Sequence, residues 1–448
     1  MKSVATYIVR RLREKGFSAY LVGGCVRDLL LGIRPKDWDI ATDARPEEIQ
    51  KLFRKTIPVG AKFGVVIVRL RGKNYEVATF RRDLEYKDGR HPAGVEFAGP
   101  REDALRRDFT INGMFYDPLE DKILDFVGGK KDLKKGIIRA IGEPEQRFGE
   151  DKLRMLRAVR FSARFKFPIE PRTKSAIKKL APKILEVSPE RIREELIQIF
   201  TQKNPDLGLE LMDELGLLEP ILPEVSAMKE VPQPPEFHPE GDVFTHTKLM
   251  LGLMKKPSPE LAFAVLLHDI GKPQTISFED RIRFNNHAVV GAEMSEKILR
   301  RLRFSNQQIK IITSLVRDHL KFMEVKKMRE STLKKFLLSE NFELHLELHR
   351  LDCLASHKDL SSYKFVKKKL EEFKEELEKQ KKKPKRLITG NDLIALGLKP
   401  GPIFRQILEA VEDAQLEGKI KTRKQALEWV KEFIKDKKPQ KKGEENEQ

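Results

Sequence analysis

The sequence predicts a multidomain protein with an N-terminal α/β domain, built on a small and mostly antiparallel sheet with helices, followed by all-α regions. The first observation is length, because 448 residues exceed what one typical hydrophobic core organises. The second is that strand-like segments fall before about residue 140, whereas helical periodicity prevails from residue 145 onward. The third is a proline-rich stretch at residues 231–235, which cannot continue a helix and therefore marks a boundary.

Local patterns predict the individual elements in order. We expect a helix at residues 4–15, then short strands at 19–22 and 37–41. Residues 65–71 and 75–80 are typical of an antiparallel pair joined by a hairpin loop. Ser188 followed by Pro189 predicts a helix N-cap with proline in the first turn. Thr389 and Asp392 form a capping box that opens a later helix.

These patterns divide the chain into six regions. They are an α/β domain at 1–144, a helical region at 145–230, a second helical region at 237–363, a Lys/Glu-rich helix at 364–386, a last helical unit at 387–435 and a charged tail at 436–448. The tail lacks apolar residues, so we expect it to be disordered. The Lys/Glu-rich helix is equally compatible with a solvated linker and with an RNA contact.

The charge balance favours a nucleic-acid partner. Lys and Arg total 88 against 69 Asp and Glu, a net charge of +19, whereas a merely solubilising surface is the simpler alternative. Two cysteines are too few for a disulfide framework, which indicates a reducing compartment. No apolar run is long enough to span a membrane, and the first residues do not resemble a signal peptide. We therefore expect a cytoplasmic protein with no membrane partner.

A pair of short motifs near the N-terminus indicates phosphate chemistry. Gly23 and Gly24 precede Arg27, so backbone N–H groups can approach a polyphosphate and a guanidinium can add charge. Asp37 and Asp39 are two residues apart, so on a strand both carboxylates would point to one face. Two hard oxygen ligands beside a triphosphate are suited to Mg²⁺.

These and later motifs closely resemble the class II tRNA nucleotidyltransferase and bacterial poly(A) polymerase family. The matching segments cover the first half of the chain in family order: Gly23-Gly24-x-Val26-Arg27-Asp28, Asp37-x-Asp39-Ile40-Ala41-Thr42, Glu76-Val77-Ala78-Thr79-Phe80-Arg81, Arg106-Arg107-Asp108-Phe109-Thr110-Ile111-Asn112, Asp125-Phe126-Val127-Gly128-Gly129, Glu150-Asp151-x-x-Arg154 and Ser188-Pro189-Glu190-Arg191. The resemblance implies a nucleotidyltransferase head at 1–144 and a helical neck at 145–230 that selects the nucleotide.

The resemblance implies two-metal phosphoryl transfer in the head. Asp37 and Asp39 would hold two Mg²⁺, and Glu76 would be the third catalytic carboxylate, unless it is an ordinary strand-edge residue. The triphosphate would be held by Gly23, Gly24 and Arg27, with Arg107 beside it. For Arg107 the alternative is a structural salt bridge with Asp108.

Base choice would depend on the start of the neck. On one helix Asp151 and Arg154 would lie one turn apart, with Arg157 and Arg160 continuing the same stripe. A carboxylate accepts from the exocyclic amine of cytosine or adenine, and a guanidinium donates to the ring nitrogen. Uracil would leave both groups mispaired, at a cost of about 1–3 kcal/mol per contact. The alternative is a surface ion pair without any role in base choice.

Several segments indicate which nucleotides the protein would add, and to which RNA. Residues 60–65 and the segment 86–92 resemble parts that accompany CCA or terminal A addition, and 387–393 begins a unit that resembles the tail holding the tRNA elbow. We therefore expect ATP and CTP as substrates and tRNA, at its 3′ end and elbow, as partner. Poly(A) synthesis is the alternative within the family, and the oligomeric state stays open.

The second helical region, 237–363, carries the order H…HD…H…H…D and resembles the HD phosphohydrolase superfamily. The resemblance implies metal ligands at His246, His268, Asp269, His287, His319 and Asp352, with Asp318 competing for the last place. Neutral imidazoles with carboxylates suit a transition metal such as Ni, Mn, Co or Fe, and metal-bound hydroxide could hydrolyse cyclic or monoester phosphates. Two rival functions are a hydrolase whose head only senses nucleotides, and an RNA-binding scaffold with a degenerate head.

Overall fold

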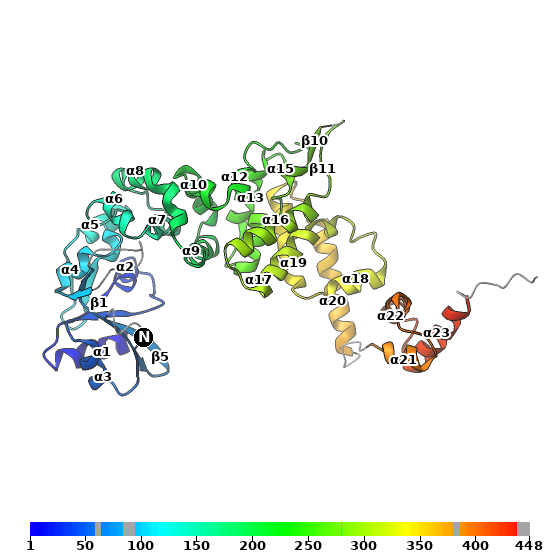
Figure 1. The fold of residues 1–448 in the computed structure, drawn as a ribbon, viewed down its shortest axis with the longest axis horizontal. Coiled ribbons are helices and arrows are strands. Elements are labelled where there is room, and N and C mark those ends of the chain that lie inside the picture. Colours follow the sequence, from blue (N-terminus) through cyan, green and yellow to red (C-terminus); the bar gives the residue numbers. More distant parts are fainter. Residues whose placement is uncertain (59–63, 84–94, 279, 380–385, 437–448) are drawn as a thin grey trace, which may run out of the picture. The chain divides into compact units, whose positions relative to one another are not determined.

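The computed structural model describes residues 1–58, 64–83, 95–278, 280–379 and 386–436. The chain divides into two compact units, Met1–Val316 and Arg317–Gln448, and each is described by itself (Figure 1). The division falls inside the region 237–363 that the sequence pattern treats as one. Among the described residues, no helix is both long and apolar enough to cross a membrane.

The head is built on one seven-stranded sheet of order β3-β4-β5-β2-β1-β8-β9. Only β2 and β5 run parallel; the other neighbours are antiparallel, as the sequence predicts. The strands are β1 (Ala19–Val22), β2 (Asp39–Thr42), β3 (Thr56–Ile57), β4 (Val65–Leu70), β5 (Lys73–Thr79), β8 (Met114–Asp117) and β9 (Lys122–Asp125). A separate pair consists of β6 (Arg81–Asp83) and β7 (Val95–Phe97). The predicted hairpin is therefore confirmed as β4 and β5.

Two boundaries in the head differ from expectation. The first helix, α1, is Lys2–Arg13, and the strand predicted at 37–41 begins only at Asp39. Asp37 thus precedes the strand, and the argument that two strand residues share one face is wrong for this pair. The remaining head helices are α2 (Gly24–Leu30), α3 (Pro46–Leu52), α4 (Pro100–Leu105) and α5 (Gly129–Lys135). Fully buried Leu21, Ile40 and Val77 make the sheet part of the core.

The neck is helical throughout, as predicted. Its helices are α6 (Pro144–Glu150), α7 (Leu153–Phe165), α8 (Pro171–Leu180), α9 (Pro189–Thr201), α10 (Pro205–Glu214), α11 (Leu218–Ile221) and α12 (Pro223–Ser226). Ser188 is the N-cap of α9 with proline in its first turn, which confirms that prediction. Helix α7 packs on α9 and α10, and its buried face includes Met155, Leu156 and Val159.

The rest of the first unit contains α13 (Val243–Leu253), α14 (Pro259–Leu267), α15 (Lys272–Thr275), α16 (His287–Arg301) and the start of α17 (Asn306–Asp318). The expectation of an all-α region is wrong at one point, because β10 (Ile276–Phe278) and β11 (Ile282–Phe284) pair antiparallel. Each strand alternates an apolar β-branched or aromatic residue with a polar one, a pattern suited to a short hairpin.

The second unit has two hydrophobic cores. Phe322, Phe336, Phe342 and Val366 belong to the first, and Leu393, Ile407 and Val430 to the second, among other residues. Its helices are α18 (Glu330–Leu337), α19 (Phe342–Ala355), α20 (Ser361–Lys379), α21 (Gly390–Ala395), α22 (Pro402–Leu416) and α23 (Arg423–Asp436).

Two predictions concern the ends of elements in the second unit. The capping box is confirmed, because Thr389 N–H donates to Asp392 Oδ2 at 2.7 Å. The tail predicted to be disordered lies, except for Asp436, outside the described residues, as does the loop 86–92.

Candidate active site

A cleft of about 660 Å³ opens in the first unit, where the head meets the neck. Its walls carry nine Lys and Arg side chains and five carboxylates, so the cleft is polar and cationic. The lining residues are Gly23, Gly24, Cys25, Arg27, Asp28, Lys36, Asp37, Asp39, Arg106, Arg107, Asp108, Asn112, Asp151, Leu153, Arg154, Arg157, Arg160, Phe161, Arg164, Arg191, Gln198 and Gln202. All the predicted nucleotide ligands and two of the three predicted catalytic carboxylates are in this set.

The three carboxylates predicted to be catalytic lie near one another, because Glu76 and Asp37 both affect the pKa of Asp39. The parallel register pairs Ile40 with Val77, which places Asp39 and Glu76 on neighbouring strands at the same level. Burial, then the nearby charge of Glu76, raises the pKa of Asp39 to about 6, and Asp37 adds to the effect against the opposing charge of Arg107. Such crowding of negative charge is the electrostatic condition under which a carboxylate cluster favours a cation.

The glycine pair is needed for the close approach of backbone and guanidinium. Gly23 has φ 69°, in the left-handed region that favours glycine. A Cβ built there would lie 3.1 Å from Arg107 Nη1. Arg107 donates to Asp103 through Nε at 3.2 Å and Nη2 at 2.9 Å. The alternative of a structural salt bridge is thus correct in kind but wrong in its partner, which is Asp103 and not Asp108.

Arg27 is a buried component of the cleft wall, with 3% of the residue exposed. It donates to Asp28 Oδ1 through Nε at 2.9 Å and through Nη2 at 2.7 Å. Its Nη1 donates to Asn112 Oδ1 at 2.6 Å, and its guanidinium lies 5.0 Å from the ring centre of Phe161. Burial lowers the pKa of Arg27, and the charge of Asp28 counteracts that effect.

Helix α7 supplies a row of arginines that are held by carboxylates. Arg157 contacts Asp108 Oδ2 through Nη2 at 2.6 Å and through Nε at 2.8 Å, and Arg160 Nε lies 3.2 Å from Glu195 Oε2. Although burial opposes ionisation, the charge of Arg157 and the amide of Asn112 hold the pKa of Asp108 well below its usual range. Such fixed, ionised pairs keep guanidinium groups in place before any ligand binds.

The predicted base-selecting pair does not lie on one helix. Asp151 is the C-cap of α6, and Arg154 is in the first turn of α7. Asp151 accepts a two-pronged contact from Arg191, at 3.1 and 2.8 Å. Arg154 Nη1 donates to Glu150 Oε2 at 2.8 Å and to the Arg147 carbonyl at 2.9 Å. The expected shared helix face is thus wrong, although both side chains do line the same cleft.

Sequence reasoning missed the residues that hold these groups in position. They are Asp103, Asn112, Arg191 and Glu195, each of which contacts a predicted ligand. Asn112 and Arg191 stand inside motifs that were recognised from the sequence, so their roles could have been suspected. Asp103 and Glu195 had no such signal, because their importance depends on the packing of α4 and α9.

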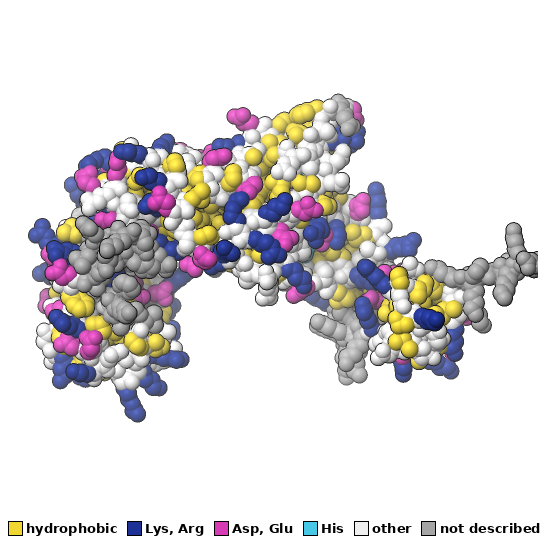
Figure 2. Space-filling model, viewed as in Figure 1, with side chains coloured by type: hydrophobic (Ala, Val, Ile, Leu, Met, Phe, Trp, Pro, Cys, Tyr) yellow, Lys and Arg dark blue, Asp and Glu magenta, His cyan; other side chains and the backbone are white. Residues whose placement is uncertain are grey.

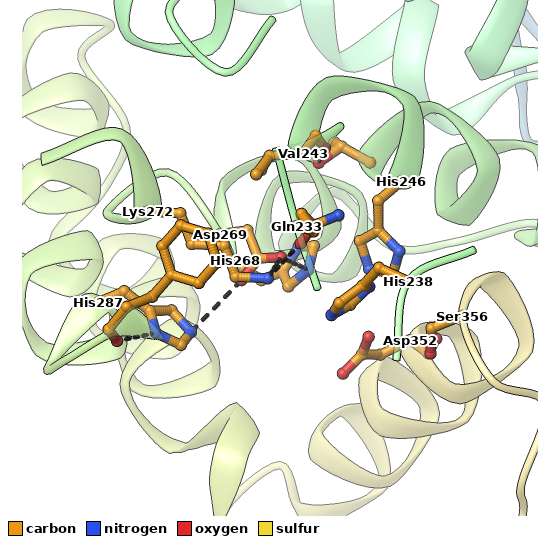
Figure 3. Close-up of polar contacts among 12 residues, drawn as sticks. Gln233, His238, Val243, His246, His268, Asp269, Lys272, His287, Asp352 and Ser356 are labelled. Atoms are coloured by element: carbon orange, nitrogen blue, oxygen red, sulfur yellow. Dashed lines mark hydrogen bonds and ion pairs between the residues drawn. The ribbon is translucent and has the colours of Figure 1, made fainter. Parts of the chain in front are cut away.

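A second cluster of ionisable side chains, here called the histidine cluster, gathers His246, His268, Asp269 and His287 in the first unit (Figure 3). His268 Nε2 lies 3.1 Å from Asp269 Oδ2, and His287 Nε2 lies 3.5 Å from Asp269 Oδ1. The ring centres of His246 and His268 are 5.4 Å apart. All four residues are buried. Four of the six predicted ligands are therefore brought together.

Neighbours of the histidine cluster already contact its carboxylate and its imidazoles. Lys272 Nζ lies 2.7 Å from Asp269 Oδ2 and donates to Gln233 Oε1 at 2.6 Å. Glu240 Oε1 lies 2.5 Å from His246 Nδ1. Burial lowers the pKa of His287, which favours the neutral imidazole, against the charge of Asp269. His238, Glu240 and His246 could also share a metal ion, because their ligand atoms lie within 4.8 Å of one another.

The remaining predicted ligands belong to the second unit. His319 is buried at the start of the 3-10 helix His319–Met323, and Asp352 is half-buried on α19. The competing residue Asp318 is the N-cap of that 3-10 helix, and its Oδ1 lies 3.1 Å from Lys321 Nζ. A complete six-residue metal site therefore stays a prediction.

Three family models match the chain in sequence. The poly(A) polymerase head domain matches residues 19–139, and the model described as "Probable RNA and SrmB-binding site of polymerase A" matches residues 166–229. The model of tRNA nucleotidyltransferase domain 2 matches residues 287–430. The first two matches coincide with the head and the neck, and the third extends over both units.

Relatives and a solved structure agree with these models. The CCA-adding enzyme of Ligilactobacillus salivarius is 48% identical over 204 residues, 45% of this chain and 50% of that protein. Poly(A) polymerase I of Salmonella typhi is 39% identical over 233 residues, 50% of either protein. The chain spans about half the length of these two relatives. The crystal structure of the Bacillus stearothermophilus CCA-adding enzyme in complex with CTP is 28% identical, with a TM-score of 0.75, over 96% of this chain and 97% of that one. The chain is therefore similar to CCA-adding enzymes and bacterial poly(A) polymerases in its first half, and to one solved CCA-adding enzyme over nearly its whole length.

Proposed function

We propose that the protein adds C and A residues to the 3′ end of tRNA, using CTP and ATP without a nucleic-acid template. The observation that carries the proposal is the cleft itself, which Asp37 and Asp39, just before and at the start of β2, line together with a wall of fixed arginines. A triphosphate matches the cationic wall in charge, and a metal-bound triphosphate matches both sides. The family and the net charge of +19 support an RNA substrate.

The carboxylates fit the Mg²⁺ that such a reaction requires. Burial, and then the neighbouring charges of Glu76 and Asp37, raise the pKa of Asp39, and a bound cation would relieve the repulsion among these carboxylates. Asp37, Asp39 and Glu76 would hold the ions, all with the oxygen ligands that Mg²⁺ prefers. Bound there, Mg²⁺ supplies charge neutralisation for the triphosphate and lowers the pKa of an RNA 3′-hydroxyl.

The residues of the chain would position both reactants. Gly23 and Gly24 leave room for phosphate oxygens beside Arg107, and Arg157 and Arg160 are held in the wall by Asp108 and Glu195. The function of this wall is preorganisation, because its guanidinium groups need not reorient as charge develops.

Asp151 and Arg154 keep hydrogen-bonding capacity for a base. A carboxylate has about four lone-pair sites and a guanidinium has five N–H donors, and the contacts to Arg191 and Glu150 leave some of each. The same contacts hold the side chains of Asp151 and Arg154 in place, so a base must match their remaining hydrogen-bonding groups. Cytosine and adenine match, whereas a mispaired base would cost about 1–3 kcal/mol per contact.

The test gives purified protein each nucleoside triphosphate alone with three RNAs. The RNAs are a tRNA that lacks its CCA end, a tRNA that ends in CC, and an unrelated oligonucleotide. We expect incorporation of C on the first and of a single A on the second. Long A tracts on the unrelated RNA would instead establish the poly(A) polymerase alternative, and no incorporation at all would contradict both.

A second candidate function concerns the histidine cluster. Buried imidazoles beside one carboxylate are a donor set that suits Ni, Mn, Co or Fe, and we propose that His319 and Asp352, or Asp318, complete it. A bound metal of this kind would activate water for phosphoester hydrolysis. Asp269 currently contacts Lys272, so metal binding must compete with that cation. Metal analysis of the protein and of His268→Ala, after growth with each metal, tests the site.

We also propose that the six predicted regions keep their assigned functions. Head 1–144 and neck 145–230 would carry out addition, 237–363 would hold the second metal, and 387–435 would bind the tRNA elbow after the linker helix 364–386. A protein truncated after residue 386 should therefore still add nucleotides to a short acceptor RNA while binding whole tRNA more weakly.

A further inference from the structure

Two further hollows adjoin the catalytic cleft on the surface of the head. One, of about 400 Å³, shares Lys36 and Asp37 with the cleft. The other, of about 460 Å³, shares Met1 and Trp38 with the first hollow. The shared residues show that the three spaces follow one another along the loop that precedes β2. We call the two outer hollows together the head groove.

The head groove is lined by cations that are available for a ligand. Arg34, Lys36, Arg69 and Lys73 are all exposed, and within the described residues no ion-pair partner is found for any of them. Among the described residues that line the two hollows, Asp37 is the single carboxylate. The arginines of the catalytic cleft differ from these groove cations, because Arg27, Arg157 and Arg191 each have a carboxylate partner.

The groove also offers surfaces for bases. Trp38 lies where the two hollows meet and is 5% exposed, so the core holds its ring and a base could reach only the small part that lines the hollows. Ile33, at 37% exposed, adds apolar area to one hollow, and Asn74 adds an exposed amide to the other. Aromatic side chains and cations along a groove are typical of sites for single-stranded nucleic acid.

We propose that the head groove binds the single-stranded 3′ end of the acceptor RNA. The RNA phosphates would lie along Arg69, Lys73, Lys36 and Arg34, and a base would contact Trp38. The proposal rests on the proposed nucleotide addition, since Asp37 at the end of the groove is where the 3′-hydroxyl would have to arrive. Contacts to phosphate are independent of sequence, so the groove would accept an RNA end before and after each addition.

The first experiment compares two double variants of equal charge. Arg69→Ala with Lys73→Ala removes two groove cations on the β4–β5 hairpin, and Lys134→Ala with Lys135→Ala removes two exposed lysines of α5 as the control. In the groove variant we expect the KM for acceptor RNA to rise about tenfold, while the KM for CTP changes less than twofold. The slope of log Kd for single-stranded RNA against log salt should fall by about 1.4, or 0.7 for each lost phosphate contact.

Several outcomes would overturn the groove assignment. If the control variant shows the same loss, the effect is only one of net charge. If the KM for CTP rises and that for RNA does not, the groove belongs to the nucleotide or to departing pyrophosphate. Equal thermal unfolding of the two variants and the parent protein excludes misfolding as the cause.

The second experiment measures binding without catalysis. The chain has two tryptophans, so Trp429→Phe leaves Trp38 as the only one. Titration with a short single-stranded RNA ending in CC should then quench the fluorescence of Trp38, whereas CTP with Mg²⁺ should not. An unchanged signal at saturating RNA would discard the groove. Quenching without any nucleotide addition would instead contradict the proposed function and keep the groove.

Discussion

The catalytic cleft and the histidine cluster both bury ionisable groups, but they do so with opposite electrostatics. In the cleft, guanidinium groups such as those of Arg157 and Arg27 are charged and held by carboxylates, and an open volume of about 660 Å³ remains. In the histidine cluster, buried imidazoles surround Asp269, and burial lowers the pKa of His287 so that its neutral form is favoured. This difference is the basis of the two proposals, a large anion in the first region and a small cation in the second.

The largest expected effect tests the carboxylates of the cleft. Asp39→Ala should lower nucleotide addition about 10³-fold or more, because several kcal/mol of metal-dependent stabilisation would be lost. The KM for acceptor RNA should change little, since RNA contacts lie elsewhere. Single-nucleotide incorporation on a tRNA lacking its CCA end measures both. The control is Asp43→Ala, an exposed carboxylate just after the same strand; an equal loss there would refute the assignment.

The second prediction separates the two regions. His268→Ala combined with Asp269→Ala should abolish bound transition metal while leaving nucleotide addition within about twofold of the parent, because neither residue lines the cleft. Elemental analysis and incorporation assays on the same preparation give the two readouts. Unchanged metal content would remove the histidine cluster as a metal site, and a large fall in addition would show that the regions are coupled.

The third prediction concerns the contact by which Arg191 holds Asp151, the residue proposed to contact the base. Arg191→Met removes the two-pronged partner of Asp151 and should lower the preference for CTP over UTP about tenfold, the effect of one weakened polar contact. The KM for tRNA should not change. Arg191→Lys, which keeps the charge but not the fork, should restore part of the preference. If Arg191→Met keeps full selectivity, Asp151 does not depend on this contact.

The smallest expected effect is on the free energy of unfolding. The histidine cluster and the cleft should lose their contributions to it at different pH values. Burial lowers the pKa of His287 from 6.5, so without metal this contribution to stability is present above pH 6.5 and is lost as the pH falls below it. Asp108 is held well below 3.8 despite burial, so the stability from its pair with Arg157 is lost only at a pH below 3.8. Urea unfolding in EDTA from pH 7.5 to 3.5 measures this dependence, and His287→Gln should make the free energy of unfolding vary less with pH between pH 7.5 and 5. An unchanged curve between pH 7.5 and 5 would contradict the neutral state of His287.

Several elements of the fold were predictable from local chemistry. The hairpin of β4 and β5, the proline at the start of α9 and the capping box at Thr389 depend on residues close in sequence. The short pair β10 and β11 was missed because three-residue strands carry too little periodicity to be distinguished from a helical surrounding. The start of β2 was misplaced by two residues, the usual uncertainty at the end of an element.

In the candidate site, too, some features were predictable from the sequence and others depend on the tertiary structure. The sequence alone determined which residues carry charge and oxygen ligands, and the resemblance to a known family implied that Asp39, Arg107 and Asp151 belong to one site. Only the tertiary structure decided their partners: Asp103 for Arg107, Arg191 for Asp151 and Asp108 for Arg157. Residue type and near neighbours set what a side chain can bind. Burial and long-range packing set its pKa and its contacts, because these depend on residues brought together only when the chain folds.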